Sequence, residues 1–204
     1  MELLCSLLKS LKFCDGGVKV GGFVVDSHYK KSDIFQSLPI FAFEDIEELV
    51  DINAVQFVLA LGYSNMNEHR QAKFNYCKSR GYKVFTYVSQ QAQVLTDKVG
   101  EGSIILPGTY IGPYSEVGIC TVIRPGTVLA HHDVIGDFNW IADGCTLGGG
   151  VKMGSHCFLG LGTTVRNEIT KLTILSLELK LIWDEIQNDL RLTSVFHQGR
   201  LKMC

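Results

Sequence analysis

Aliphatic residues recur at every sixth position through the middle of the chain. The series has twelve members, and all of them are aliphatic: Val99, Ile105, Ile111, Val117, Ile123, Leu129, Ile135, Ile141, Leu147, Met153, Leu159 and Val165. Glycine follows seven of them, and the fifth residue of most repeats is small. An antiparallel β-sandwich would instead show alternation of period two and irregular strand spacing. The pattern therefore predicts a parallel β-helix with three flat faces, in which twelve repeats of six residues form four coils.

The composition of this segment supports a solenoid. Of the 21 glycines, 14 lie within residues 99–170, and only nine of these 72 residues are charged. A triangular prism of this kind has apolar faces and open ends, so it commonly buries a face against other copies of itself. We therefore expect a homotrimer.

The residues before the repeat alternate between strand-like and helix-like patterns. Gly81 is placed to end a helix, and the expected elements are strands at 18–25, 54–61 and 82–88 and helices at 43–50 and 67–79. This alternation predicts a small α/β unit of the Rossmann-like type. A polar, Gln-rich hinge at 89–97 follows it, so the expected domains are 1–89, 90–170 and 171–204.

Charge and cysteine content exclude several classes of protein. The formal charge of −2, from 19 basic and 21 acidic residues, lacks the positive excess that sequence-independent nucleic-acid binding requires. No apolar stretch approaches the roughly 20 residues that span a bilayer. The seven cysteines form no C-x-x-C pair, which fits reduced thiols. We expect a cytoplasmic protein with no membrane span and no nucleic-acid partner.

The order of parts is typical of one enzyme family. After the α/β part, residues 128–165 read VLAHHDVIGDFNWIADGCTLGGGVKMGSHCFLGLGTTV, with a histidine block followed by a Gly-rich repeat. Over residues 18–170 the chain resembles the bacterial sugar acetyltransferases of the hexapeptide-repeat superfamily, in the branch that contains sialic-acid O-acetyltransferases and nucleotide-amino-sugar N-acetyltransferases. The resemblance implies a left-handed β-helix. It also implies transfer of an acetyl group from acetyl-CoA to a hydroxyl or amine of a sugar, in cell-surface polysaccharide synthesis.

The resemblance assigns the catalytic base to His131 and a neighbouring, orienting position to His132. An imidazole suits this step because a sugar hydroxyl or ammonium is a poor nucleophile at neutral pH, and the imidazole can accept its proton as the new bond forms. Transfer is then direct, within a ternary complex and without a cysteine nucleophile. Asp133 could steady the resulting imidazolium, or it could serve only in a turn, and the sequence leaves both roles open.

The resemblance also assigns an acetyl-CoA site. Backbone N–H groups at glycine can approach a developing oxyanion closely, since no Cβ intervenes. Gly149, with Gly150 beside it, matches this donor position, offered from the adjacent subunit; a plain corner of the coil is the alternative. Leu161 and Gly162 match positions along the pantetheine arm of CoA, where the alternative is ordinary core and turn.

Two residues are candidates for the sugar or nucleotide-sugar. Asp26 matches an acidic site that meets a nucleotide base or ribose, and its alternative is a turn residue. Trp140 could stack on a sugar face, or it could fill space at a subunit interface. Zinc hydratases of the same prism shape need three histidines, and only His156 joins the adjacent pair within the repeat, so we expect no metal.

Both ends of the chain depart from the family pattern. The first strand and its Gly-rich phosphate-binding turn are missing ahead of MELLCSLLKSLKF. The repeat stops after Thr170, and a shifted reading of the codon junctions permits residues that would finish the last coil. Our hypothesis is a single-nucleotide frameshift near residue 171. The alternative to an active enzyme is therefore an impaired trimeric remnant that binds CoA or sugar without turnover.

Overall fold

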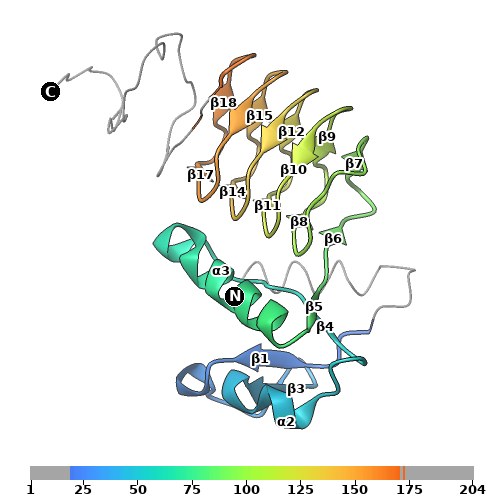
Figure 1. Cartoon of the computed structure of the whole chain (residues 1–204), viewed down its shortest axis with the longest axis vertical. Helices are drawn as coiled ribbons and strands as arrows, with labels where there is room; N and C mark the ends of the chain where they lie inside the picture. The colour runs from blue at the N-terminus through green and yellow to red at the C-terminus, as the bar shows by residue number, and fades with distance from the viewer. Residues whose placement is uncertain (1–18, 171, 173–204) are drawn as a thin grey trace, which may run out of the picture.

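The structure is a computed structural model that describes residues 19–170 and 172, and it consists of a β-helix stacked beside a smaller α/β part (Figure 1). The smaller part contains β1 (Phe23–Val25), η1 (Ser27–Tyr29), β2 (Ile34–Phe35), β3 (Leu38–Ala42), η2 (Phe43–Asp45), α2 (Ile46–Leu49), β4 (Gln56–Phe57), η3 (Ser64–Asn67), α3 (Glu68–Ser79) and β5 (Lys83–Val84). The expected missing first strand and the tail after residue 172 fall outside the described residues.

The β-helix is built from strands of two residues that stack into three parallel sheets. The first sheet has the order β17-β14-β11-β8-β6, the second β18-β15-β12-β9-β7 and the third β10-β13-β16. The bounds are β6 (Tyr87–Val88), β7 (Gln93–Val94), β8 (Ile104–Ile105), β9 (Tyr110–Ile111), β10 (Glu116–Val117), β11 (Val122–Ile123), β12 (Val128–Leu129), β13 (Val134–Ile135), β14 (Trp140–Ile141), β15 (Thr146–Leu147), β16 (Lys152–Met153), β17 (Phe158–Leu159) and β18 (Thr164–Val165).

The six-residue aliphatic series forms the interior of the prism. From Ile105 to Val165 its members are nearly or wholly buried and belong to one core cluster. Cys145 and Cys157 lie in the same cluster as free, buried thiols, which agrees with their small inward positions. Burial of apolar side chains is the main favourable term in folding, so this column of side chains holds the coils together. The predicted parallel β-helix is confirmed.

The coil begins earlier than the sequence pattern indicated. Strand β6 pairs with β8 and strand β7 pairs with β9, so residues of the predicted hinge at 89–97 lie within the first coil. The register aligns Val88 with Ile105 and Val94 with Ile111, while Val99 bridges to Val117. Only five residues separate Val94 from Val99, and this missing residue places the first coil out of step with the six-residue series.

Turns of the β-helix contain a left-handed residue at every sixth position. The positive φ values run from Gly102 to Glu168, and half of the twelve positions hold a residue other than glycine: Tyr114, Cys120, His132, Phe138, His156 and Glu168. A positive φ is uncommon for such residues and costs free energy unless the surroundings fix it. Here the repeat imposes it, so the conformation of His132 belongs to the coil geometry.

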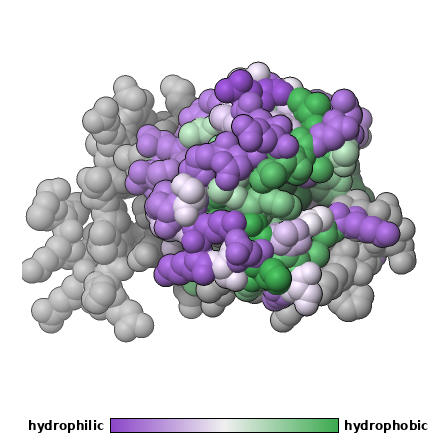
Figure 2. All heavy atoms as spheres, turned by 90° about the horizontal axis from the view of Figure 1, so that it is seen from below, coloured by the Kyte–Doolittle hydropathy of each residue, from purple (hydrophilic) through white to green (hydrophobic). Residues whose placement is uncertain are grey.

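The smaller part follows the predicted alternation only in part. Both predicted helices and the helix stop at Gly81 (φ 79°) are present, but the antiparallel pair β2–β3 was not predicted, and the expected strand at 82–88 divides into β5 and β6. Residues 19–84 form two separate small sheets, β1-β3-β2 and β4-β5, in place of one continuous parallel sheet. Viewed from the end that carries this part, apolar side chains form a band bordered by hydrophilic ones (Figure 2).

Helix α3 joins the two parts. Its Phe74 and Cys77 pack in one cluster with Cys120 and Phe138 from turns of the β-helix. The outward residues of the first sheet, including Ile104, Val122 and Trp140, form a second cluster with the segment after β4. The first sheet is therefore covered by the smaller part, which leaves the turn between the second and third sheets on the far side of the prism.

Candidate active site

The predicted catalytic residues gather at the turn between the second and third sheets. His131 and His132 follow β12, and Gly149 and Gly150 follow β15 one coil later. The β12–β15 register places Leu129 beside Leu147, so the two turns stack directly. Both histidine side chains are exposed. The structure thus brings together four of the residues that the sequence singled out.

The ring of His131 lies against Gly149. A Cβ atom at Gly149 would stand 2.5 Å from Cε1 and 2.8 Å from Nε2 of His131, closer than real contacts allow. The Gly150 N–H donates to the His131 carbonyl over 2.9 Å, and Gly150 has a φ of 74°. Glycine at 149 is therefore required by the imidazole itself. The contact is made within one chain, whereas the sequence analysis placed Gly149 on the adjacent subunit.

The two histidines contact each other through matching nitrogens. Nδ1 of His131 lies 3.0 Å from Nδ1 of His132. Only one of the two atoms can carry the shared proton, so a hydrogen bond here fixes opposite tautomers. When His131 donates from Nδ1, its Nε2 holds a free lone pair, which is the state a general base needs. The pair can therefore orient His131 for proton removal.

An exposed tyrosine completes this corner. Tyr114 lies 18 residues before His132, and the two rings have centroids 4.8 Å apart at an angle of 31°. The Tyr114 side chain is 74% exposed. The sequence analysis missed this residue, although a search at the 18-residue period of one coil would have placed it next to His132.

Asp133 lies beneath the corner and inside the coil. Its side chain is fully buried, and Oδ1 accepts a hydrogen bond of 2.8 Å from the Val151 N–H. Oδ2 has no hydrogen-bond partner among the described residues. Burial raises the pKa of the carboxyl from 3.8 to about 6, against the opposing effects of backbone N–H groups and of His131. The carboxyl is thus electrostatically coupled to the candidate base.

The remaining predicted site residues lie elsewhere on the chain. Leu161 and Gly162 are in the turn between β17 and β18, which joins the first and second sheets, and Leu161 is 70% exposed. Trp140 is on the covered first sheet, and Asp26 follows β1 in the smaller part. A single chain therefore does not bring these residues to His131.

Trp140 has a structural environment. It is 7% exposed, Tyr63 lies 5.3 Å from its ring, and the guanidinium groups of Arg70 and Arg124 lie 5.4 Å and 5.9 Å from its centroid. This arrangement favours the alternative role for Trp140, the filling of space, although the space lies between the two parts of one chain.

Asp26 is paired with a cation. Its carboxylate accepts a hydrogen bond from Lys73 of α3, and both side chains are partly exposed. The Lys73 ammonium also lies 3.6 Å from the Phe43 ring centroid, a cation–π contact. The sequence analysis missed Lys73. The pair presents both signs of charge to solvent, and the nucleotide role of Asp26 stays a prediction.

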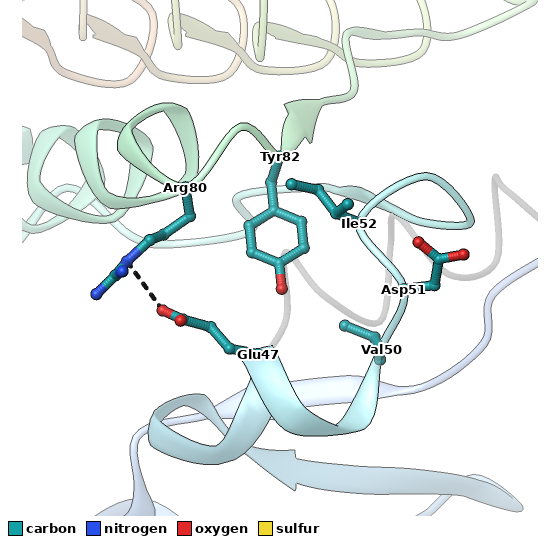
Figure 3. Close-up of a pocket in the computed structure, with 6 residues that line it drawn as sticks. All are labelled: Glu47, Val50, Asp51, Ile52, Arg80 and Tyr82. Carbon is teal, nitrogen blue, oxygen red and sulfur yellow. Dashed lines mark ion pairs between the residues drawn. The ribbon is translucent and has the colours of Figure 1, made fainter.

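A shallow pocket of about 460 Å³ lies in the smaller part, away from the histidine corner (Figure 3). Glu47, Arg80 and Tyr82 line it, and Arg80 Nε forms an ion pair of 3.0 Å with Glu47. None of the predicted site residues lines it. Within residues 19–170 and 172, no group of three or more His, Cys, Asp or Glu side chains could hold a metal ion, and no helix in that part is long and apolar enough to cross a membrane.

The fold is that of the hexapeptide-repeat β-helix proteins, as the resemblance predicted. No family model and no curated protein sequence matches the chain. A variant of perosamine N-acetyltransferase from Caulobacter crescentus, in complex with CoA and GDP-perosamine, is similar with a TM-score of 0.64 and 18% identity, over 86% of this chain and 90% of that one. The acetyltransferase domain of PglB from Neisseria gonorrhoeae, in complex with acetyl coenzyme A, is similar with a TM-score of 0.59 and 15% identity, over 83% and 81%. These similarities establish the left-handed β-helix.

The close contact between His131 and Gly149 gives a first prediction. Gly149→Ala is expected to displace the imidazole and to lower the kcat of acetyl transfer about tenfold, because its methyl group would overlap the ring. Gly144→Ala is the matched control: Gly144 has a φ of 69° and open space around its Cα, so the cost should be about 1 kcal/mol of unfolding free energy without loss of kcat. Equal loss of activity in both variants would contradict the prediction.

Proposed function

We propose that this protein transfers an acetyl group from acetyl-CoA to a hydroxyl or amine of a sugar. The observation that carries the proposal is the His131 ring held against Gly149, with its Nδ1 paired to His132. The fold is shared with sugar acetyltransferases whose structures contain acetyl-CoA, or CoA with GDP-perosamine, which supports the substrate class.

In the proposed reaction, Nε2 of His131 removes the proton from the acceptor as its oxygen or nitrogen attacks the thioester carbonyl. The new bond joins the acceptor to the acetyl carbon, and the tetrahedral intermediate then breaks the carbon–sulfur bond. His131 returns the proton to the departing thiolate sulfur. His132 accepts the Nδ1 hydrogen bond throughout, so the imidazolium keeps its orientation. The N–H of Gly149 is our candidate donor to the oxyanion.

The site is completed by a neighbouring copy in this proposal. Leu161 and Gly162 occupy a different edge of the prism from His131, so an extended CoA molecule would contact both edges only where two prisms lie side by side. We propose a homotrimer with the active site in the groove between copies. Asp26 is kept as a contact for a nucleotide-linked acceptor.

The test is release of CoA thiol from acetyl-CoA with nucleotide-linked amino-sugars and sialic-acid-like sugars as acceptors. Release that depends on one acceptor supports the transferase, and the product distinguishes an ester from an amide. A folded trimer that is stabilised by CoA but releases no thiol with any acceptor would correspond to the impaired remnant and would contradict the proposal.

A further inference from the structure

The interior of the β-helix contains a ladder of polar side chains with a fixed hydrogen-bonding rule. A side chain at the fifth position of a repeat accepts from the backbone N–H 18 residues later, as Ser103 does from Thr121 and Asn139 from Cys157. It also donates to the carbonyl 15 residues later. Seven side chains make this second bond: Ser103 to Gly118, Thr109 to Arg124, Thr121 to Gly136, Thr127 to Ala142, Asn139 to Gly154, Cys145 to Gly160 and Cys157 to Leu172.

Asp133 follows only the first half of this rule. Its Oδ1 accepts from Val151, 18 residues later, but its Oδ2 is buried without a partner in the described part of the chain. An ionised carboxylate has no proton to donate to a carbonyl, whereas a protonated carboxyl has one. The 15-residue rule identifies its acceptor as the carbonyl of Gly148, the first residue of the glycine turn that supports His131.

We propose that Asp133 is a positioning residue that acts as a neutral acid, donating its Oδ2 proton to the Gly148 carbonyl and so fixing the turn against which His131 rests. The consequence for catalysis rests on the proposed acetyl transfer. The consequence for the coil does not, because the ladder stabilises the turn whatever reaction takes place beside it.

The charges around Asp133 favour the neutral form. His131 is the charged neighbour that acts on the carboxyl, and it lies in the same turn. The flanking strands contribute Glu116 and Lys152 at the positions paired with Val134, and Glu168 lies next to Gly150 in the following coil. These three side chains are not buried, whereas Asp133 is, and no cation is paired with Asp133 inside the described coil. A buried carboxylate without a partner is costly, and protonation removes that cost.

The sign of the pH dependence follows from the raised pKa of Asp133. Because the folded value of about 6 exceeds the ordinary 3.8, the folded state binds the proton more tightly than the unfolded state. The stabilisation is present below about pH 4, falls as the pH rises to about 6, and is absent above that. The turn beneath His131 is therefore held most firmly in mild acid.

The experiment compares the wild type with Asp133→Asn, in which the amide supplies a permanent donor, as Asn139 does in the next coil. We expect the Tm of the variant minus that of the wild type to rise by about 5 °C between pH 4.5 and pH 7.5. Asp137→Asn is the matched control, since the partly exposed Asp137 only accepts from the Ile119 N–H, and its difference should stay flat. A flat difference for Asp133→Asn, or a variant destabilised at every pH, would overturn the proposal.

Activity gives a second readout. The ratio of kcat/KM for Asp133→Asn to that of the wild type is expected to rise about threefold or more from pH 5.5 to pH 8, as the wild-type carboxyl loses its proton. A fall in this ratio would show that an ionised Asp133 balances the charge of His131, and it would overturn the neutral-acid role. If no acceptor supports turnover, the proposed function fails while the Tm comparison still decides the role of Asp133.

Discussion

His131→Ala is expected to lower the kcat of acetyl transfer by about 100-fold or more while the protein stays folded and still binds CoA. Removal of a general base typically costs this much, because the acceptor must then lose its proton to water. The side chain is exposed and packs mainly on Gly149, so its removal opens space above the turn without disturbing the interior. The measurement is the rate of thiol release with saturating acetyl-CoA and the acceptor that supports wild-type turnover.

Two comparisons sharpen this test. Added imidazole should restore part of the lost rate in His131→Ala, since a small base can enter the space above Gly149, and it should leave the wild-type rate unchanged. His69→Ala is the control, because His69 is exposed on α3 and contacts only Asn65. Retention of full activity by His131→Ala would exclude His131 as the base. Loss of activity without rescue, together with loss of CoA binding, would indicate a binding role instead.

The β-helix was predictable because its physical cause is local and repeated. An aliphatic side chain must enter the prism at each face, and six residues make one face, so the period appears directly in the sequence. The first coil escaped this reading because one residue is missing between Val94 and Val99, which shifts the register without changing the fold. The pair β2–β3 escaped it because such short strands carry too few residues to show a period.

The histidine corner was predictable in its members but not in its contacts. The sequence indicated His131, His132 and the glycines as one site, yet it gave no reason for Gly149 beyond its matching position. The reason is the imidazole ring against its Cα, a contact between two turns one coil apart. Asp133 could be read only as two alternatives, because its orphaned Oδ2 depends on the full set of ladder bonds. Such partners lie 15 and 18 residues away, beyond the reach of local pattern.

Arg70 is the largest feature that the sequence concealed. The side chain is fully buried in a helix that otherwise reads as polar, and it has no carboxylate partner among the described residues. One nitrogen, Nη1, donates to the carbonyl of Cys120 over 3.2 Å. The other, Nη2, donates to Leu61 over 2.8 Å and to Gly62 over 3.1 Å. Burial lowers the pKa of the guanidinium to about 10, so it stays charged at neutral pH. A single side chain thus links α3, the segment after β4 and a turn of the β-helix.

Arg70→Ala is therefore expected to lower the free energy of unfolding by about 3 kcal/mol or more. The substitution leaves buried carbonyl groups without donors, each costing about 1–3 kcal/mol, and it opens a cavity beside the Trp140 ring. Arg70→Lys should lie between the two, because a lysine keeps the charge but cannot reach separate carbonyls from a planar fork. Urea unfolding followed by Trp fluorescence is the measurement.

Arg80→Ala provides the matched control for Arg70. It lies just beyond the end of the same helix, its side chain is 55% exposed and its ion pair with Glu47 is open to solvent, so its loss should cost less than about 1 kcal/mol. If Arg70→Ala were no more destabilising than Arg80→Ala, the carbonyl contacts of Arg70 would not hold the two parts together. If the variant instead unfolded in two steps, with the β-helix retaining the wild-type midpoint, the arginine would stabilise the smaller part alone, and the interface of α3 with the turns would contribute little to the stability of the coil.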